Sequence, residues 1–247
     1  MTGDLWGEDV ARGYDEDSSW MFSPELLGAT CDVLVDLAAG RRALEFAIGT
    51  GRVGVALAGR GVPVAGIEMS PAMAARLREK MVPGSAAAGI ELVMGDMSSA
   101  RVEGEFGLVY LVYNTITNLL EQDEQVECFR NAARHLAPGG YFLVEVGVPE
   151  LQRLPPGETA RPFHVGREHL GFDTFDLVEQ RLTSHHYRFT EDGRVSRFES
   201  HHRYAWPAEY DLMARIAGLE RFARWSGWDR AEFTAASTSH VSVWRKP

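Results

Sequence analysis

The chain has 247 residues, 45% of them hydrophobic, and a formal net charge of −10. This length suits one α/β domain with an elaboration, or two small domains, and needs no disulfide or metal to hold its core. The negative charge disfavours nucleic acid as a partner, because the phosphate backbone repels an acidic protein. The acidic N-terminus lacks a signal-peptide core, and no apolar run approaches the roughly 20 residues of a membrane span, so we expect a cytoplasmic protein with no membrane partner.

The first 148 residues predict helices followed by alternating strands and helices. Helices are predicted at residues 4–16 and 22–38. Five short apolar runs predict strands, at residues 42–46, 62–67, 90–94, 106–113 and 141–146. Between them the pattern predicts a helix at residues 51–61 with Gly61 as its C-cap, a helix that starts at Ser70-Pro71, and a helix at about 122–136. Strands that are apolar on both faces and alternate with helices predict a doubly wound parallel sheet.

The pattern changes after Val146. Residues 150–166 are rich in proline and polar groups and predict a loop. Two or three antiparallel strands follow between about residues 168 and 206, with a hairpin turn at residues 191–193. A helix from Pro207 and a last pair of strands complete the chain. Cys31 and Cys128 lie far apart in helical patterns, which predicts small core residues and neither a zinc site nor a redox pair.

The segment from Glu45 to Gly54 contains G-x-G-x-x-G, and Glu68 lies where a dinucleotide-binding fold keeps its ribose-binding acid. This fingerprint alone is weak. Glu45, however, precedes the glycine loop directly, where its carboxylate would repel a pyrophosphate at short range. S-adenosylmethionine instead carries a sulfonium and an α-ammonium, which a carboxylate attracts. Glu45 therefore favours S-adenosylmethionine over a nicotinamide dinucleotide.

A third acid follows the third predicted strand. Asp96, in Gly95-Asp96-Met97, can accept a hydrogen bond from an adenine amine. Because open α/β sheets bind ligands at the carboxyl ends of their strands, Glu45, Glu68 and Asp96 are expected at one edge. The three acids together suit a cationic nucleoside.

Five segments, ALEFAIGTGR, GIEMSPAM, MGDM, FGLVYLVYNTITNL and LAPGGYFLVEV, resemble in order and spacing the motifs of class I S-adenosylmethionine-dependent methyltransferases. More faintly, residues 10–40 and 180–247 resemble small-molecule N-methyltransferases of actinobacterial antibiotic pathways. The resemblance implies a Rossmann-like sheet of seven strands, six parallel and one antiparallel, with N-terminal helices and an appended antiparallel sheet. It divides the single domain into a helical cap (1–40), a cofactor-binding core (41–148), the appended sheet (149–206) and a C-terminal helix with the last strands (207–247).

The resemblance also implies roles for individual residues. The cofactor S-adenosylmethionine, with S-adenosylhomocysteine as its product, is expected to contact Tyr14, Glu45, Ala47, Gly49, Gly51, Glu68, Met69, Gly95, Asp96, Met97, Val112 and Tyr113. The acceptor is expected to contact Trp20, Tyr113, Asn114 and Asn118, and Tyr14 and Asn118 are the catalytic candidates. Ala47 replaces the first glycine of the loop, and Asn118 stands where sugar N-methyltransferases resemble each other in having histidine.

These features predict methyl transfer to nitrogen, in preference to oxygen, of a small metabolite. An amine needs only to lose a proton, whereas a hydroxyl needs a general base such as histidine. The pairs His185-His186 and His201-His202 favour packing or surface roles over a metal site, since neighbours on a strand face opposite ways, and one of the four remains open as a base. The appended sheet either covers the active site or forms a homo-oligomer contact. The alternative functions are a nicotinamide-dependent oxidoreductase and a non-catalytic S-adenosylmethionine-binding protein.

Overall fold

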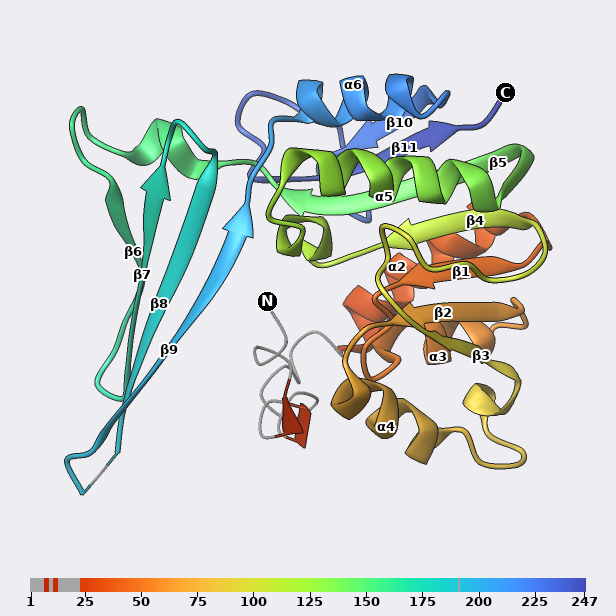
Figure 1. The fold of residues 1–247 in the computed structure, drawn as a ribbon, viewed down its shortest axis with the longest axis horizontal. Helices are drawn as coiled ribbons and strands as arrows, with labels where there is room; N and C mark the ends of the chain where they lie inside the picture. The colour runs from red at the N-terminus through yellow and green to blue at the C-terminus, as the bar shows by residue number, and fades with distance from the viewer. Residues whose placement is uncertain (1–6, 9–10, 13–22, 191) are drawn as a thin grey trace.

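The computed structural model describes residues 7–8, 11–12, 23–190 and 192–247 of the chain (Figure 1). Tyr14 and Trp20 lie outside this part, as does most of the helix predicted at residues 4–16, so these expectations stay predictions. The second predicted helix is present as α2 (Pro24–Ala38). None of the helices in the described residues has the length and apolar character that a membrane crossing requires.

The core is a seven-stranded sheet with the order β10-β11-β5-β4-β1-β2-β3. Its strands are β1 (Ala43–Phe46), β2 (Val64–Glu68), β3 (Glu91–Met94), β4 (Phe106–Leu111), β5 (Leu136–Gly147), β10 (Glu220–Trp225) and β11 (Ser239–Arg245). Only β11 runs antiparallel to both of its neighbours in the sheet. The predicted sheet of six parallel strands and one antiparallel strand is therefore confirmed.

Helices cover both faces of this sheet and bury two separate apolar clusters (Figure 1). One cluster packs the sheet against α5 (Gln122–His135) and α6 (Pro207–Ile216), through residues such as Phe129 and Tyr210. The other packs it against α2, α3 (Arg52–Ala58) and α4 (Pro71–Lys80), through residues such as Leu34 and Leu57. Because β1, β2 and β4 lie between the two helical layers, they are fully buried.

Helix boundaries follow local chemistry. Ser70 caps α4 as predicted, since its Oγ accepts the Met73 N–H at 3.2 Å, and Pro71 occupies the first turn. The C-terminal end predicted for the preceding helix, residues 51–61, was wrong. Helix α3 stops at Ala58 with Gly59 as its C-cap, and Gly61, at φ +85°, only turns the chain toward β2.

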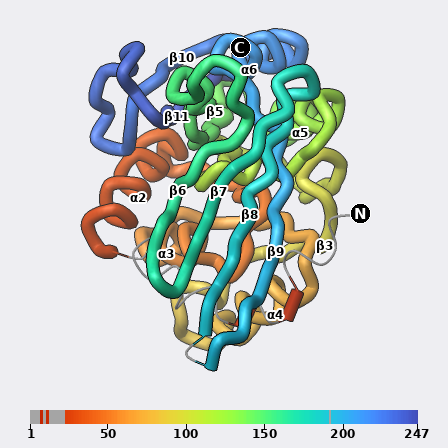
Figure 2. The backbone as a smooth tube through the Cα atoms, turned by 90° about the vertical axis from the view of Figure 1, so that its left-hand side faces the viewer, coloured from red at the N-terminus to blue at the C-terminus, as the bar shows by residue number. Residues whose placement is uncertain are grey.

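The appended sheet has four antiparallel strands, β6 (Ala160–Val165), β7 (His169–Asp176), β8 (Arg181–Phe189) and β9 (Val195–Arg203). The prediction of a loop at residues 150–166 was therefore wrong, because this segment forms the short helix η4 (Glu150–Arg153) and the edge strand β6. Proline is tolerated there at position 162, since an edge strand leaves some N–H groups unpaired. The sheet stands beside the core and faces the carboxyl ends of β1, β2 and β4 (Figures 1 and 2).

Candidate active site

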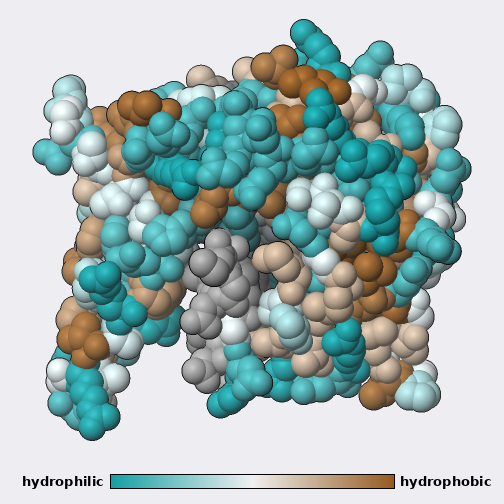
Figure 3. All heavy atoms as spheres, in the orientation of Figure 1, coloured by the Kyte–Doolittle hydropathy of each residue, from teal (hydrophilic) through white to brown (hydrophobic). Residues whose placement is uncertain are grey.

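A cavity of about 1080 Å³ lies between the carboxyl edge of the core sheet and the appended sheet. Figure 3 shows a hollow between the two parts below α5. Most of the predicted cofactor and acceptor residues line this cavity, namely Glu45, Ala47, Gly49, Glu68, Met69, Gly95, Asp96, Met97, Val112, Tyr113, Asn114 and Asn118. The carboxyl edge of the sheet thus brings these residues together, as predicted, whereas Gly51 does not line the cavity.

The loop between β1 and α3 turns through left-handed backbone at Ala47 (φ +51°), Gly49 (φ +61°) and Gly51 (φ +86°). Left-handed backbone is strained for alanine, which explains why glycine is usual at the first position. Gly51 begins α3 behind the loop, where a Cβ atom would lie 2.5 Å from Leu77 Cδ1. Gly51 therefore allows α3 to pack against α4.

Glu45 is the innermost acid of the cavity, and its side chain is 3% exposed. Its Oε2 accepts the Tyr110 hydroxyl at 3.0 Å, and the Gly54 backbone also bonds the carboxyl group. Burial raises the pKa of Glu45 to about 8, and these hydrogen bonds oppose the rise. Glu45 was expected to carry a negative charge, whereas its raised pKa favours the neutral carboxyl group near pH 7.

Glu68 joins the end of β2 to the glycine loop. Its Oε2 accepts the Gly49 N–H at 2.8 Å and its Oε1 accepts the Ser70 N–H at 2.7 Å. Burial raises its pKa, and the backbone hydrogen bonds oppose that rise. Glu68 thus holds the loop and the start of α4 in place while its carboxylate forms part of the cavity wall.

Asp96 follows β3 and uses one oxygen for its own turn. Oδ1 accepts both the N–H and the hydroxyl of Ser98, at 2.7 and 2.6 Å. No hydrogen bond to Oδ2 is recorded among the described residues, so this oxygen is available to an amine in the cavity. Met97 beside it is 8% exposed, while Met69, across the cavity wall, is 49% exposed.

The end of β4 differs from its prediction. The strand stops at Leu111 and not at Tyr113, because Tyr113 (φ +56°) and Asn114 (φ +61°) adopt left-handed backbone. Hydrogen bonds to β5 hold this turn: the Tyr113 N–H donates to Glu145 Oε2 at 2.9 Å, and Asn114 Oδ1 accepts the Gly147 N–H at 2.7 Å. The turn leads into η3 (Thr115–Asn118), which brings Asn118 to the cavity.

Sequence reasoning missed Arg52, which follows the glycine loop. It is the one arginine or lysine among the described residues that line the cavity, and its guanidinium lies 5.8 Å from the centre of the Tyr113 ring. A cation among so many acids suits a carboxylate of the ligand. Its position inside the G-x-G-x-x-G motif, next to the predicted cofactor residues, could have indicated that Arg52 lines the site.

The opposite wall was predicted only in part: the appended sheet was expected either to cover the active site or to form a homo-oligomer contact, and the aspartate and serines of this wall were missed. Strands β7 to β9 contribute Asp173, Ser184, His186, Ser200, His201 and His202. The signal was the two-residue period of a strand, which places Ser184 with His186 and Ser200 with His202 on one face. His185 lies outside the cavity wall and bonds Glu199 on the other face at 3.1 Å. Within the described residues, no three His, Cys, Asp or Glu side chains come together as a metal site.

The comparisons with known proteins agree with this geometry. A family model described as a methyltransferase domain matches residues 43–140. A cypemycin N-terminal methyltransferase from a Streptomyces species is 31% identical over 186 residues, which cover 73% of each chain. The chain belongs to this methyltransferase family.

Solved structures extend the similarity to nearly the whole chain. The CcbJ methyltransferase of Streptomyces caelestis matches this methyltransferase with a TM-score of 0.86 and 36% identity, covering 98% of this chain and 97% of that one. The amino pentose methyltransferase CalS10 of Micromonospora echinaspora has the same fold, with a TM-score of 0.72 and 22% identity over 99% of each chain. The expectations of a class I methyltransferase fold and of methyltransferase activity are confirmed, and the oxidoreductase alternative is wrong.

Proposed function

We propose that this methyltransferase methylates a nitrogen of a small metabolite, in antibiotic or other secondary metabolism. S-adenosylmethionine is its methyl donor. The observation that carries the proposal is a single cavity with two unlike walls: an acid-lined, glycine-rich wall at the sheet edge and a polar wall from the appended sheet. A relative named as an N-terminal methyltransferase and structures of amino pentose and sugar N-methyltransferases with the same fold support the choice of nitrogen.

The sheet-edge wall fits S-adenosylmethionine. Asp96 Oδ2 suits the adenine amine, and Glu68, with its oxygens already aligned by two backbone N–H groups, suits the ribose hydroxyls. Met69 and Met97 would lie on either side of the adenine. Arg52 would hold the carboxylate of the methionine portion, with Glu45 behind it near the positive charges.

The bound cofactor supplies a methyl group already activated by its sulfonium. The chain's residues then need to align the acceptor nitrogen and exclude water, which is the larger part of catalysis for such a reaction. Tyr113, Asn114 and Asn118, at the turn after β4, lie between the two walls and would border the acceptor. Tyr14 and Trp20 stay candidates for closing the site.

Calorimetric titration with S-adenosylmethionine, S-adenosylhomocysteine and NADH tests the proposal. We expect micromolar binding of the first two ligands and none of NADH. Asp96→Ala and Glu68→Ala should each weaken cofactor binding by about 1–3 kcal/mol, the cost of a lost buried hydrogen-bond partner. Glu105→Ala is the matched control, because Glu105 is an exposed acid at the opposite, amino end of β4.

Transfer of the methyl group is a separate readout. Incubation with S-adenosylmethionine and a panel of amines and alcohols, followed by mass spectrometry, should give a product 14 Da heavier from amines. Cofactor binding without methylated product would contradict the proposal and favour a non-catalytic binding protein. Products from alcohols alone would replace nitrogen by oxygen as the methylated atom.

A further inference from the structure

Three polar side chains form a row across the cavity face of the appended sheet. Asp173 on β7 is paired directly with Ser184 on β8, and Ser184 is paired directly with Ser200 on β9. All three line the cavity. Directly paired residues in antiparallel strands have Cβ atoms about 5 Å apart, so the row presents closely spaced oxygen atoms to whatever the cavity holds.

The hydroxyl proton of Ser184 is already used. Its Oγ donates to Asp173 Oδ1 at 2.6 Å. A hydroxyl group has one proton to donate, so Ser184 can offer the cavity only the lone pairs of its oxygen. Asp173, as a carboxylate, also only accepts.

The proton of Ser200 is directed by a chain of hydrogen bonds that begins at the turn after β4. The Thr117 hydroxyl donates to the Asn114 carbonyl at 2.7 Å, and that carbonyl can only accept. Thr117 Oγ1 also lies 3.0 Å from His202 Nδ1. Because the threonine proton is already engaged, His202 Nδ1 must carry the hydrogen and donate it to Thr117.

This tautomer determines the role of Ser200. Burial lowers the pKa of His202 to about 4, so the ring is neutral near pH 7 and its second nitrogen accepts. His202 Nε2 lies 3.1 Å from Ser200 Oγ. Ser200 therefore donates its hydroxyl proton to His202, and it too offers the cavity only lone pairs.

We propose that Asp173, Ser184 and Ser200 form an acceptor-only subsite that binds the N–H groups of the methyl acceptor. His202 and Thr117 are its positioning residues. The inference rests on the proposed function and assigns its acceptor side: the ligand is a primary or secondary amine, which binds the row in its protonated form with three or two N–H groups. A group without N–H donors leaves these oxygens unpaired, which is a strong basis for its rejection.

Binding of three probes to the protein saturated with S-adenosylhomocysteine tests the subsite. Cyclohexylamine and N,N,N-trimethylcyclohexylammonium are both cations near pH 7.5, but only the first has N–H donors, and cyclohexanol is a neutral analogue with one donor. Ligand-observed NMR titration should show cyclohexylamine binding about tenfold more tightly than either of the others, the effect of hydrogen bonds to a charged donor.

The variants Ser184→Ala and Ser200→Ala should each reduce this preference severalfold, and the triple variant Asp173→Ala/Ser184→Ala/Ser200→Ala, which removes every member of the row, should abolish it. Thr183→Ala is the matched control on the same strand, because Thr183 is adjacent to Ser184 and does not line the cavity. Thr117→Val should also reduce the preference, because it removes the oxygen that fixes the tautomer of His202. The ring can then carry its hydrogen on Nε2 and donate it to Ser200, whose own hydroxyl proton becomes available to the cavity. Thr117→Ser, which keeps the hydroxyl, should restore it.

Affinity for S-adenosylhomocysteine, measured on every variant, separates the two proposals and reports an intact fold. No binding of S-adenosylhomocysteine to the wild type would overturn the proposed function. Normal binding together with equal affinities for the three probes would overturn the subsite alone. So would a preference for cyclohexylamine that survives in the Asp173→Ala/Ser184→Ala/Ser200→Ala triple variant.

Discussion

Among single residues, Gly54 shows why the third glycine of the G-x-G-x-x-G sequence matters here. It lies in the first turns of α3, and a Cβ atom at this position would lie 2.7 Å from Glu45 Oε2 and 2.8 Å from Ile48 Cδ1. Glu45 and Ile48 are both buried and cannot move aside freely. The absence of a side chain at Gly54 thus allows the Glu45 carboxyl group to lie against the backbone of α3.

Gly54→Ala should therefore weaken S-adenosylhomocysteine binding at least tenfold and lower the free energy of unfolding by about 1–3 kcal/mol, the usual cost of overpacking. Calorimetric titration and urea denaturation measure the two effects. Gly59→Ala, in the same segment, is the control, because its Cβ atom would meet nothing closer than 3.4 Å and its backbone is right-handed. Equal behaviour of the two variants would show that Glu45 tolerates displacement.

Among the elements, α5 organises the loops around the cavity through buried polar side chains. Gln125 Nε2 donates to the carbonyl groups of Ile116 and Leu119 in the segment after β4. Asn131 Nδ2 donates to those of Met97 and Ala100 after β3, at 2.9 Å each. One helix thus holds two cavity-lining loops at once.

His135, at the end of α5, makes this arrangement sensitive to acid. Its Nδ1 donates to the Asn131 carbonyl at 2.8 Å, and its Nε2 accepts the Val102 N–H at 3.0 Å, so only the neutral ring satisfies both. Burial lowers the pKa of His135 below its ordinary 6.5. The unfolded chain therefore binds the proton first, and stability that is complete above pH 6.5 is lost as the pH falls.

We expect the free energy of unfolding to fall between pH 7 and pH 5, with a contribution from His135 of at most about 1.4 kcal/mol per pH unit. The buried His202 and His240, whose pKa values are also lowered, contribute in the same direction, so His135→Gln should reduce the slope, whereas His201→Gln, at an exposed position, should keep it. Glu45 acts in the opposite sense: with its pKa raised to about 8, its contribution to stability falls as the pH rises from about 4.5 to 8. Denaturation of wild type and variants at each pH isolates the histidine, and an unchanged slope in His135→Gln would contradict its role.

The sequence predicted those features of these elements that show in apolar periodicity or in the order of the strands, and it did not predict those that depend on contacts between distant segments. Apolar periodicity correctly located α5, whose apolar side is buried at Phe129 and Leu136 and partly buried at Val126 and Ala133. The fully buried Gln125, Asn131 and His135 were missed, because a polar side chain in a helix reads as solvated until its partners in distant loops are known. The acids after β1, β2 and β3 were predictable, since topology alone brings strand ends together. The row on the appended sheet was not, because it depends on strand register.

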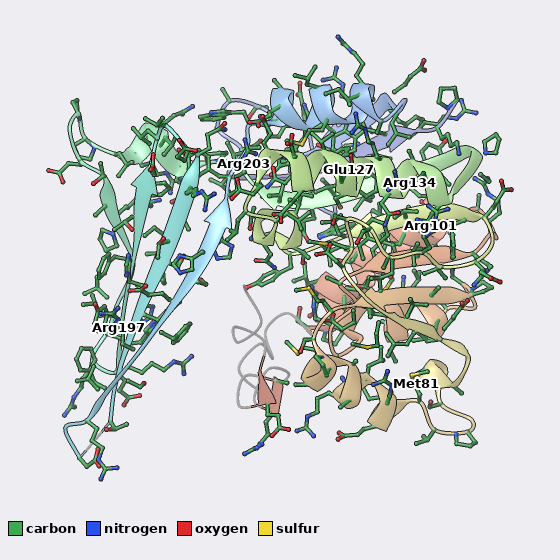
Figure 4. All side chains as sticks on the ribbon, in the orientation of Figure 1. Met81, Arg101, Glu127, Arg134, Arg197 and Arg203 are labelled. Atoms are coloured by element: carbon green, nitrogen blue, oxygen red, sulfur yellow. The ribbon has the colours of Figure 1, made fainter. Side chains whose placement is uncertain are left out.

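At the scale of the whole molecule, the appended sheet must keep a fixed distance from the core. Only then can one wall of the cavity contact the cofactor while the other contacts the methyl acceptor bound beside it. Arg203, at the end of β9, lies at the junction and is 4% exposed (Figure 4). It donates to Glu209 Oε1 at 2.6 Å, to Gln125 Oε1 at 2.7 Å and to Gln180 Oε1 at 3.2 Å. Burial alone would raise the pKa of Glu209, but the hydrogen bonds from Arg203 and its neighbours outweigh it and lower that pKa. One guanidinium thus joins β9, the turn before β8, α5 and α6.

Arg203→Met should therefore damage the molecule in two ways. It leaves the partly buried Glu209 without its cation, which costs about 1–3 kcal/mol in the free energy of unfolding. It also releases the base of the appended sheet, so among molecules that stay folded the KM of the methyl acceptor should rise more than the Kd of S-adenosylhomocysteine. Arg197→Met is the control, because Arg197 lies near the start of β9, away from the junction (Figure 4). It pairs with Glu199 and 60% of its side chain is exposed, and an ion pair at such a position is worth at most about 1 kcal/mol. Equal losses of acceptor and cofactor affinity in Arg203→Met would mean that the two walls do not depend on this junction for their spacing.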